Sequence, residues 1–128
     1  MFDGQTGALL QTIAIPPDAI AFAVDSVTGR LFMANWKDNT VSVLDIRSGA
    51  LLQPVAVGVD PIALAVDDRR NRVYALNQDS DSVSVINATT GQVERTLHTG
   101  PDPSALAVDG STGHLYVVTA GDSSVTVL

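Results

Sequence analysis

The chain has 128 residues, of which 45% are hydrophobic and 16% charged, so it is long enough for one domain and able to bury a core. Seven basic against fourteen acidic residues give a formal net charge of −7, which argues against nucleic acid as a partner. No apolar run is long enough to span a membrane, and the first residues lack the pattern of a signal peptide. The absence of cysteine excludes disulfides and thiolate metal sites.

The sequence repeats with a period of 42 residues. "AVDSVTG" begins at residue 23, "AVDDRRN" at 65 and "AVDGSTG" at 107, and no gap is needed to align the three copies. This period is typical of a propeller blade or a pair of solenoid helices. The apolar residues follow no helical spacing and fall instead in short β-rich runs between Gly, Asp, Asn and Ser clusters. Each copy therefore predicts four strands.

The predicted elements follow the repeat along the chain. Residues 1–16 are expected to be the end of a preceding blade or a ring-closing strand, with a fourth strand at 8–14. Two blades follow and then an incomplete third, at 17–58, 59–100 and 101–128. In the middle blade we expect strands at 62–67, 72–77, 82–87 and 91–98.

Strand polarity predicts how each blade is oriented. The first strand of the middle blade is apolar on both faces, which predicts that it is the most buried, and the fourth is the most polar. A sheet of this kind, repeated around an axis, is a propeller blade. The predicted fold class is all-β: a β-propeller of three four-stranded antiparallel blades, either a partial propeller or half of a six-bladed ring.

The middle repeat, "DPIALAVDDRRNRVYALNQDSDSVSVINATTG", resembles the YVTN-type β-propeller repeat. Ala19 departs from the pattern where Pro61 and Pro103 stand, and Thr119 departs from it where Asn35 and Asn77 stand. The resemblance implies a propeller fold and a place among surface-layer and other exported proteins. It also implies that similar propellers act as lactonases, lyases and haem- or quinone-linked oxidoreductases.

Three blades cannot close a ring, because propellers have about four to eight. Two explanations stay open. The chain is a fragment of a larger propeller, or two copies close head-to-tail into a six-bladed homodimer in which each donates its N-terminal strand to the other.

Strand alternation assigns the turns to two rims. The turns from fourth to first strand and from second to third strand share one rim, which carries seven aspartates against one lysine, a net charge of −6. The opposite rim carries six aspartates against five arginines, a net charge of −1. The candidate binding residues on the first rim are Asp18, Trp36, Lys37, Asp38, Asp60, Asp79, Asp81, Asp102 and Asp122.

The acidic rim has two interpretations. It would steer a basic partner or concentrate cations. Alternatively, Asp is simply a good turn residue, an interpretation favoured by the single Glu among fourteen acids. We expect Asp25, Asp67 and Asp109, which precede tight turns on the opposite rim, to be turn-forming.

No metal, cofactor or catalytic set stands out. Asn77, Asp79 and Asp81 alternate like the start of a calcium loop, but Ser82 and Ala88 replace the required Gly and Glu, so an ordinary turn is expected there.

The two histidines, His98 and His114, fall at opposite rims. His114 lies near Asp109 and Ser111 in sequence, a coincidence that a turn rich in Ser and Asp produces readily. Trp36 is either a contact residue or a plug against the neighbouring blade.

These observations predict a non-catalytic binding or scaffolding module that presents an acidic rim to a protein, polysaccharide or cation. The alternative is a part of a larger propeller enzyme whose catalytic residues lie in other blades. No cofactor and no nucleic acid are expected.

Overall fold

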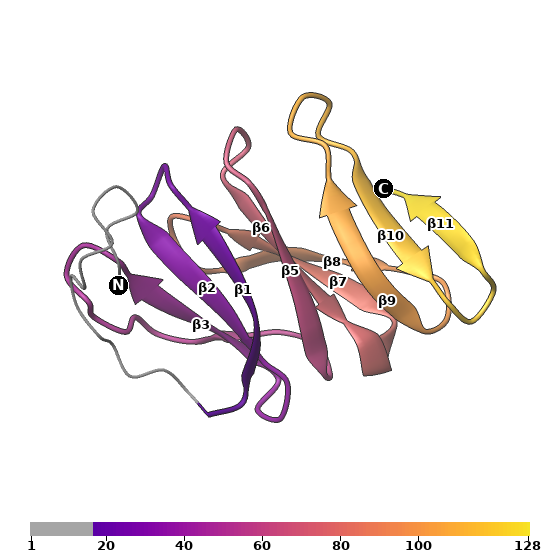
Figure 1. The fold of residues 1–128 in the computed structure, drawn as a ribbon, viewed down its shortest axis with the longest axis horizontal. Coiled ribbons are helices and arrows are strands. Elements are labelled where there is room, and N and C mark those ends of the chain that lie inside the picture. The colour runs from indigo at the N-terminus through magenta and orange to yellow at the C-terminus, as the bar shows by residue number, and fades with distance from the viewer. Residues whose placement is uncertain (1–16) are drawn as a thin grey trace, which may run out of the picture.

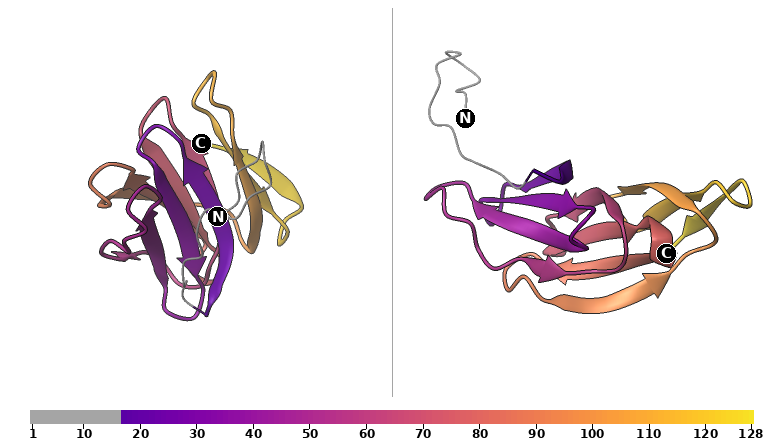
Figure 2. Two further views of the ribbon diagram at one scale, coloured as in Figure 1. Left: turned by 60° about the vertical axis from the view of Figure 1, so that its left-hand side comes forward. Right: turned by 90° about the horizontal axis from the view of Figure 1, so that it is seen from below.

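The computed structural model describes residues 17–128, which form three antiparallel sheets. The sheets lie side by side in chain order (Figure 1), and the views in Figure 2 show the same order. The first sheet contains β1 (Ala19–Asp25), β2 (Arg30–Asn35), β3 (Thr40–Asp45) and β4 (Val55–Ala56). The middle sheet contains β5 (Pro61–Asp67), β6 (Arg72–Asn77), β7 (Ser82–Asn87) and β8 (Val93–His98). The third sheet contains β9 (Pro103–Val108), β10 (Leu115–Thr119) and β11 (Ser124–Val127).

Each sheet follows the order of the chain, so that within a sheet every strand after the first pairs with the strand before it. The first strands lie along the inner edge of the three sheets, where β5 contacts both β1 and β9. This arrangement is a partial β-propeller, and the predicted all-β fold class is confirmed. The one helix in the described part of the chain is the short 3-10 turn η1 (Gln78–Ser80), which is far too short to cross a membrane.

Two apolar clusters hold the sheets together. Phe32 and Val43 of the first sheet pack against Val73 and Ile86 of the middle sheet. The opposite face of the middle sheet packs in the same way on the third sheet, through Tyr74, Leu76, Val83, Val85, Leu115 and Val117. The repeat therefore supplies every blade with one face that fits the next blade, and the core lies in the seams between sheets.

The prediction that the first strand is the most buried is wrong. Ile20, Phe22 and Val24 of β1 are 49%, 52% and 58% exposed, and the interior of β5 is only partly buried. The second and third strands carry the fully buried residues instead. The reason is that each first strand is an edge strand, with no strand beside its inner side in residues 17–128, whereas the second and third strands lie between other strands and between sheets.

The fourth strands are shorter than predicted. The segment expected at 91–98 forms β8 from residue 93, and its counterpart in the first sheet is reduced to β4 and an isolated bridge between Leu44 and Leu51. Pro54 stands where Thr96 pairs with Ser84 in the middle sheet. Proline has no N–H to donate to a sheet, so it interrupts the strand. The fourth strand predicted at 8–14 and the other expectations for residues 1–16 lie outside the described residues.

Candidate functional site

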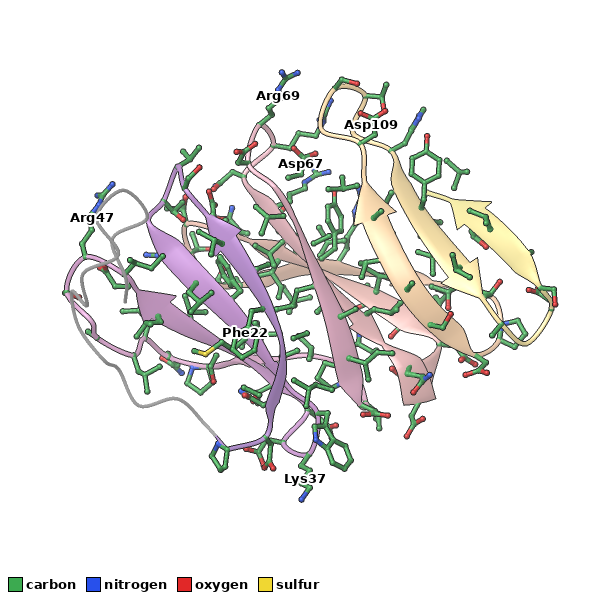
Figure 3. The ribbon with its side chains drawn as sticks, in the orientation of Figure 1. Phe22, Lys37, Arg47, Asp67, Arg69 and Asp109 are labelled. Carbon is green, nitrogen blue, oxygen red and sulfur yellow. The ribbon has the colours of Figure 1, made fainter. Side chains whose placement is uncertain are left out.

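The two kinds of turn predicted to share a rim do meet at one edge of the sheets. Gln78 N–H donates to the Asp60 carbonyl at 3.0 Å, and Ala120 N–H donates to the Asp102 carbonyl at 2.9 Å, so second-to-third turns bond to fourth-to-first turns. Figure 3 shows Lys37 at this edge and Arg69 at the opposite one. We call the first edge the acidic rim; its candidate residues are Asp18, Trp36, Lys37, Asp38, Asp60, Asp79, Asp81, Asp102 and Asp122.

Trp36 and Lys37 form the distinctive part of the acidic rim. The Lys37 ammonium lies 5.3 Å from the centroid of the Trp36 ring and 3.8 Å from an Asp18 carboxylate oxygen. Trp36 remains 39% exposed, so it is not a buried plug between blades. An exposed tryptophan beside a lysine provides a flat apolar surface with a polar border, which is typical of protein contact sites.

Side chains on the acidic rim also join neighbouring blades. Asn39 Oδ1 accepts a hydrogen bond from Asp60 N–H at 3.0 Å, and its equivalent Asp81 Oδ1 accepts one from Asp102 N–H at 3.2 Å. Asn39 and Asp81 have positive φ angles of 57° and 48°, a conformation that Asn and Asp tolerate better than most residues. One oxygen of Asp81 is therefore occupied by a structural bond across the seam.

The acids of the rim differ in their electrostatics. Burial raises the pKa of Asp60, and the negative charge of Asp79 raises it further. The pKa of Asp122 is lowered because the Ser124 and Thr119 hydroxyls donate to its carboxylate at 2.6 and 2.7 Å. The ionised Asp60 carboxylate is thus repelled by Asp79, whereas the ionised Asp122 carboxylate is stabilised by two hydroxyl donors.

The predicted calcium-like set is not brought together as a ligand shell. Asn77 is fully buried and its amide donates to Ser82 and Ser84, and Asp81 caps the seam described above. Asp79 lies in η1 between them. Within residues 17–128, no three His, Asp or Glu side chains are grouped so that they could hold a metal ion.

The opposite rim uses its aspartates as turn caps. Asp25 Oδ1 accepts from Val27 N–H at 3.0 Å, Asp67 Oδ1 from Arg70 N–H at 3.3 Å and Asp109 Oδ1 from Ser111 N–H at 3.0 Å. These bonds confirm the predicted turn-forming role.

The serine, aspartate and histidine of this rim do not form a catalytic set. The Ser111 hydroxyl donates directly to Asp109 at 2.7 Å, and these bonds lower the pKa of Asp109. The His114 ring packs edge-on against Tyr116, with the ring centroids 6.4 Å apart. Activation of a serine requires the imidazole, not the carboxylate, to accept the hydroxyl proton.

Sequence reasoning missed two features that the structure shows. Arg30 crosses a seam on the opposite rim, where its guanidinium donates to the carbonyls of Ala88 and Thr89 at 2.8 and 2.5 Å. A groove of about 640 Å³ also opens at the outer perimeter between the first and middle sheets, lined by Gln53, Pro54, Val55, Ala56, Thr90, Gly91, Gln92 and Val93. Neither feature follows from the pattern within one repeat, because each depends on how two repeats are placed.

No protein-family model matches the chain, and no curated protein matches it either. Solved structures do. Hydrazine synthase from Kuenenia stuttgartiensis is 26% identical over 95% of this chain and 36% of its own, with a TM-score of 0.80. A functionally unknown protein from Desulfotomaculum acetoxidans DSM 771 is 18% identical over 99% of this chain and 46% of its own, also with a TM-score of 0.80. The WD40 repeats of RRP9 are 15% identical over 92% of this chain and 41% of that one, with a TM-score of 0.74.

These similarities define the class of the fold. WD40 repeats are blades of β-propellers, and the chain shares their architecture without close sequence identity. The chain spans less than half the length of each of the three structures. Fold similarity at this level gives the propeller architecture and assigns no ligand.

Proposed function

We propose that the chain is a non-catalytic β-propeller module that binds a basic segment of a protein partner at its acidic rim. The observation that carries the proposal is that three acids on the same rim as the exposed Trp36 have carboxylates without a hydrogen-bond donor among the described residues. The carboxylates of Asp38, Asp60 and Asp79 accept no hydrogen bond from residues 17–128, whereas four of the aspartates on the opposite rim cap backbone turns. Capping by the carboxylate therefore accounts for four acids of the opposite rim and for none of these three, whose charges remain free to act on a partner.

The charge of the rim supports a basic partner. Seven aspartates and one lysine leave a net charge of −6 on this edge, and the only ion pair on it within the described residues is Lys37 with Asp18. Clustered like charge speeds the encounter with an oppositely charged partner, and an exposed aromatic ring supplies apolar contact once the partner has arrived. A polysaccharide and a cation are the two other classes of ligand that we propose for this rim.

Binding of a fluorescein-labelled decalysine peptide, followed by fluorescence anisotropy, tests the proposal. We expect binding that weakens steeply as salt rises from about 20 to 150 mM, because screening lengths shorten over that range. A variant with both Asp38→Asn and Asp79→Asn should bind several-fold more weakly, as should Trp36→Ala. The matched control is Asp68→Asn, which removes an exposed aspartate from the opposite rim. Equal loss in the control and the rim variants, or no binding at low salt, would overturn the proposal.

The alternative function is a part of a larger propeller enzyme whose catalytic residues lie in other blades. The similarity to a hydrazine synthase is the observation that favours it. The described residues offer no support of their own, since Ser111 and His114 are not engaged with each other.

We also infer membership of the YVTN-type propellers, with the exported, surface-layer location that this family suggests. Asn35 and Asn77, at the Asn position of the repeat, are both buried and donate to the serines Ser42 and Ser84 of the next strand. The blade divisions at 17–58, 59–100 and 101–128 belong to the same proposal. A second copy of the chain, which would complete a six-bladed ring, is the second partner that we propose.

A further inference from the structure

We propose that the groove at the outer perimeter between the first and middle sheets binds an uncharged oligosaccharide. The groove has a volume of about 640 Å³, which is within the range of ligand-binding pockets. It lies between the fourth strand of the first sheet and the turn that leads from β7 into β8. Because that turn belongs to the opposite rim, the groove is a second site, and the proposal does not depend on binding at the acidic rim.

The lining of the groove carries no charge. The eight described residues that form it are all uncharged, in a chain whose net charge is −7. A phosphate, a carboxylate or a basic peptide would lose hydration there without meeting an opposite charge. The lining also contains no aromatic ring and is mainly polar, unlike the apolar pockets that take drug-like molecules. An uncharged ligand with many hydrogen-bonding groups therefore fits it best.

Two glutamines supply hydrogen-bonding side chains from the two sheets. Gln53 lies two residues before β4, and Gln92 lies one residue before β8. Both residues are exposed, and their side chains make no hydrogen bond within residues 17–128. A carboxamide offers two donors beside an acceptor, and a sugar hydroxyl both donates and accepts. Adjacent hydroxyls of one sugar ring can therefore bond to one carboxamide in both directions.

Main-chain groups of the first wall are also available to a ligand. Val57 N–H donates to the Asn39 carbonyl at 3.1 Å, and in the preceding pair Ala56 lies opposite Thr40. Bonded and non-bonded pairs alternate along an antiparallel ladder. The N–H and C=O of Ala56 therefore point away from β3, toward the outer edge of the sheet.

The same alternation applies to Val93 in the second wall. Asn87 N–H donates to the Gln92 carbonyl at 2.8 Å, and in the following pair Val93 lies opposite Ile86. The N–H and C=O of Val93 therefore point away from β7. Each wall thus offers one main-chain donor and one main-chain acceptor in addition to its glutamine.

These main-chain groups do not form an edge to which a peptide strand could add. An added strand needs outward-pointing amides at every second residue. Pro54, two residues before Ala56, has no N–H. In the other wall, the ladder between β7 and β8 shifts its register directly after Val93. The separate donors and acceptors suit the hydroxyls of a sugar better than the regular spacing of a peptide backbone.

The floor of the groove is apolar because Gly91 has no side chain to cover it. A Cβ atom at this position would lie 3.8 Å from Cγ2 of Val55, which belongs to the first apolar cluster. Pro54 and Val93 add apolar surface on either side. The C–H face of a sugar ring can lie on such a surface while its hydroxyls reach the polar walls.

The wall formed by residues 90–93 is held in place by hydrogen bonds on both sides of the seam. Arg30 of the first sheet donates to the Thr89 carbonyl at 2.5 Å. Within the turn, Asn87 Oδ1 accepts from Thr89 N–H at 2.9 Å and from Thr90 N–H at 3.0 Å. A wall that is fixed in this way loses little conformational freedom when a ligand binds.

An NMR titration of the isotope-labelled chain tests the proposal with three uncharged probes, cellohexaose, maltohexaose and N-acetylchitohexaose. We expect at least one of them, at millimolar concentration, to shift the side-chain amide signals of Gln53 and Gln92 and the backbone N–H signals of Ala56 and Val93. Because these probes are uncharged, the affinity should stay constant as salt rises from about 20 to 150 mM. Binding of decalysine at the acidic rim should weaken over the same range.

Substitution of the two glutamines separates the groove from the rest of the surface. Gln53→Ala and Gln92→Ala should each weaken binding about three- to tenfold, the effect of one or two lost hydrogen bonds. The matched control is Gln78→Ala, which removes the same kind of side chain from the acidic rim and should leave the affinity unchanged. Circular dichroism of the three variants shows whether they keep the fold. Equal losses in the control and in the groove variants would overturn the proposal.

The peptide acetyl-Thr-Val-Thr-Val-Thr-amide serves as the competing uncharged probe. If this peptide shifted the groove signals and the hexasaccharides did not, the groove would be a strand-pairing site and the proposal would be wrong. No shift with any hexasaccharide, or shifts confined to the acidic rim around Trp36 and Asp79, would also overturn it. Decalysine binding should be the same in the groove variants and the unmodified chain, so the failure of either proposal can be told from the failure of the other.

Discussion

The middle and third sheets carry the same repeat but differ in their surroundings. The middle sheet packs against a sheet on each face, and Val83 and Val85 are 0% and 1% exposed. Among residues 17–128 the third sheet packs against a sheet on one face only, and the equivalent Val125 and Val127 are 60% and 55% exposed. The repeat therefore encodes a pair of faces that fit one another, and the position of a blade in the stack decides whether those faces form a core or a surface.

The largest expected effect on stability comes from placing a charge at the same repeat position in the two sheets, at Val83 in the middle sheet and at Val125 in the third. Val83→Asp should leave the chain unfolded, because an unpaired carboxylate buried in a seam costs several kcal/mol, comparable with the stability of a whole domain. Val125→Asp should fold, with its free energy of unfolding changed by about 0.5 kcal/mol or less as long as the chain is monomeric. Circular dichroism and urea unfolding measure both. If the two variants were equally unfolded, the third sheet would not be the open end of the stack.

A smaller difference in stability is expected when the polar side chains at the ends of β6 and β10, Asn77 and Thr119, are each replaced by alanine. The Asn77 amide is fully buried and donates to Ser82 and Ser84 at 3.2 and 3.0 Å, so Asn77→Ala should lower the free energy of unfolding by about 2–3 kcal/mol. Thr119→Ala should cost about 1 kcal/mol, because Asp122 keeps the hydrogen bond from Ser124 at 2.6 Å.

Urea unfolding measures the two alanine variants, and Asn77→Thr serves as the control, since it copies the residue of the third sheet. A cost for Thr119→Ala as large as that for Asn77→Ala would contradict the comparison between the two sheets.

Much of this fold could be predicted from the sequence because the strands and turns of a blade are determined by residues within one repeat. The 42-residue period and the alternation of β-rich runs and turns placed β6 and β7 at their observed bounds of 72–77 and 82–87. The exposure of the first strand could not be predicted in the same way, because an apolar strand such as β1 has the same composition at an edge as in the interior. Burial depends on which strands and sheets lie beside it.

The same limit applies to the acidic rim. Counting charges identified its residues, and strand alternation placed them on one edge, as the bonds between the two kinds of turn confirm. The cap from Asn39 to Asp60 N–H was missed because it joins two repeats and because Asn39 carries no charge. Asp81 and Asp79 could not be distinguished from the sequence, although only the Asp81 carboxylate accepts a hydrogen bond from the neighbouring blade, from Asp102 N–H.

The smallest expected effects are on the pH dependence of the free energy of unfolding. They have opposite signs for Asp122, in a turn of the third sheet, and Asp60, in the turn before the middle sheet. The folded pKa of Asp122 lies below its ordinary value, so its carboxylate stabilises the fold above about pH 4 and this contribution is lost as pH falls through the folded pKa. Asp122→Asn should therefore be slightly less stable than the unmodified chain at pH 7 and converge with it in acid.

Asp60, in the turn before the middle sheet, should behave in the opposite way. Its folded pKa lies above the ordinary value, so its ionised form destabilises the fold at neutral pH, and this penalty fades as pH falls from the folded to the unfolded pKa. Asp60→Asn keeps a residue that tolerates the observed φ of 60° and removes the repulsion from Asp79, so it should be slightly more stable at pH 7. Urea unfolding of both variants at about pH 7, 5 and 3.5 should show the differences from the unmodified chain shrinking from opposite sides. Two variants that shift in the same direction would mean that net charge, rather than these local contacts, controls the acid response, because each substitution removes one negative charge from the same rim.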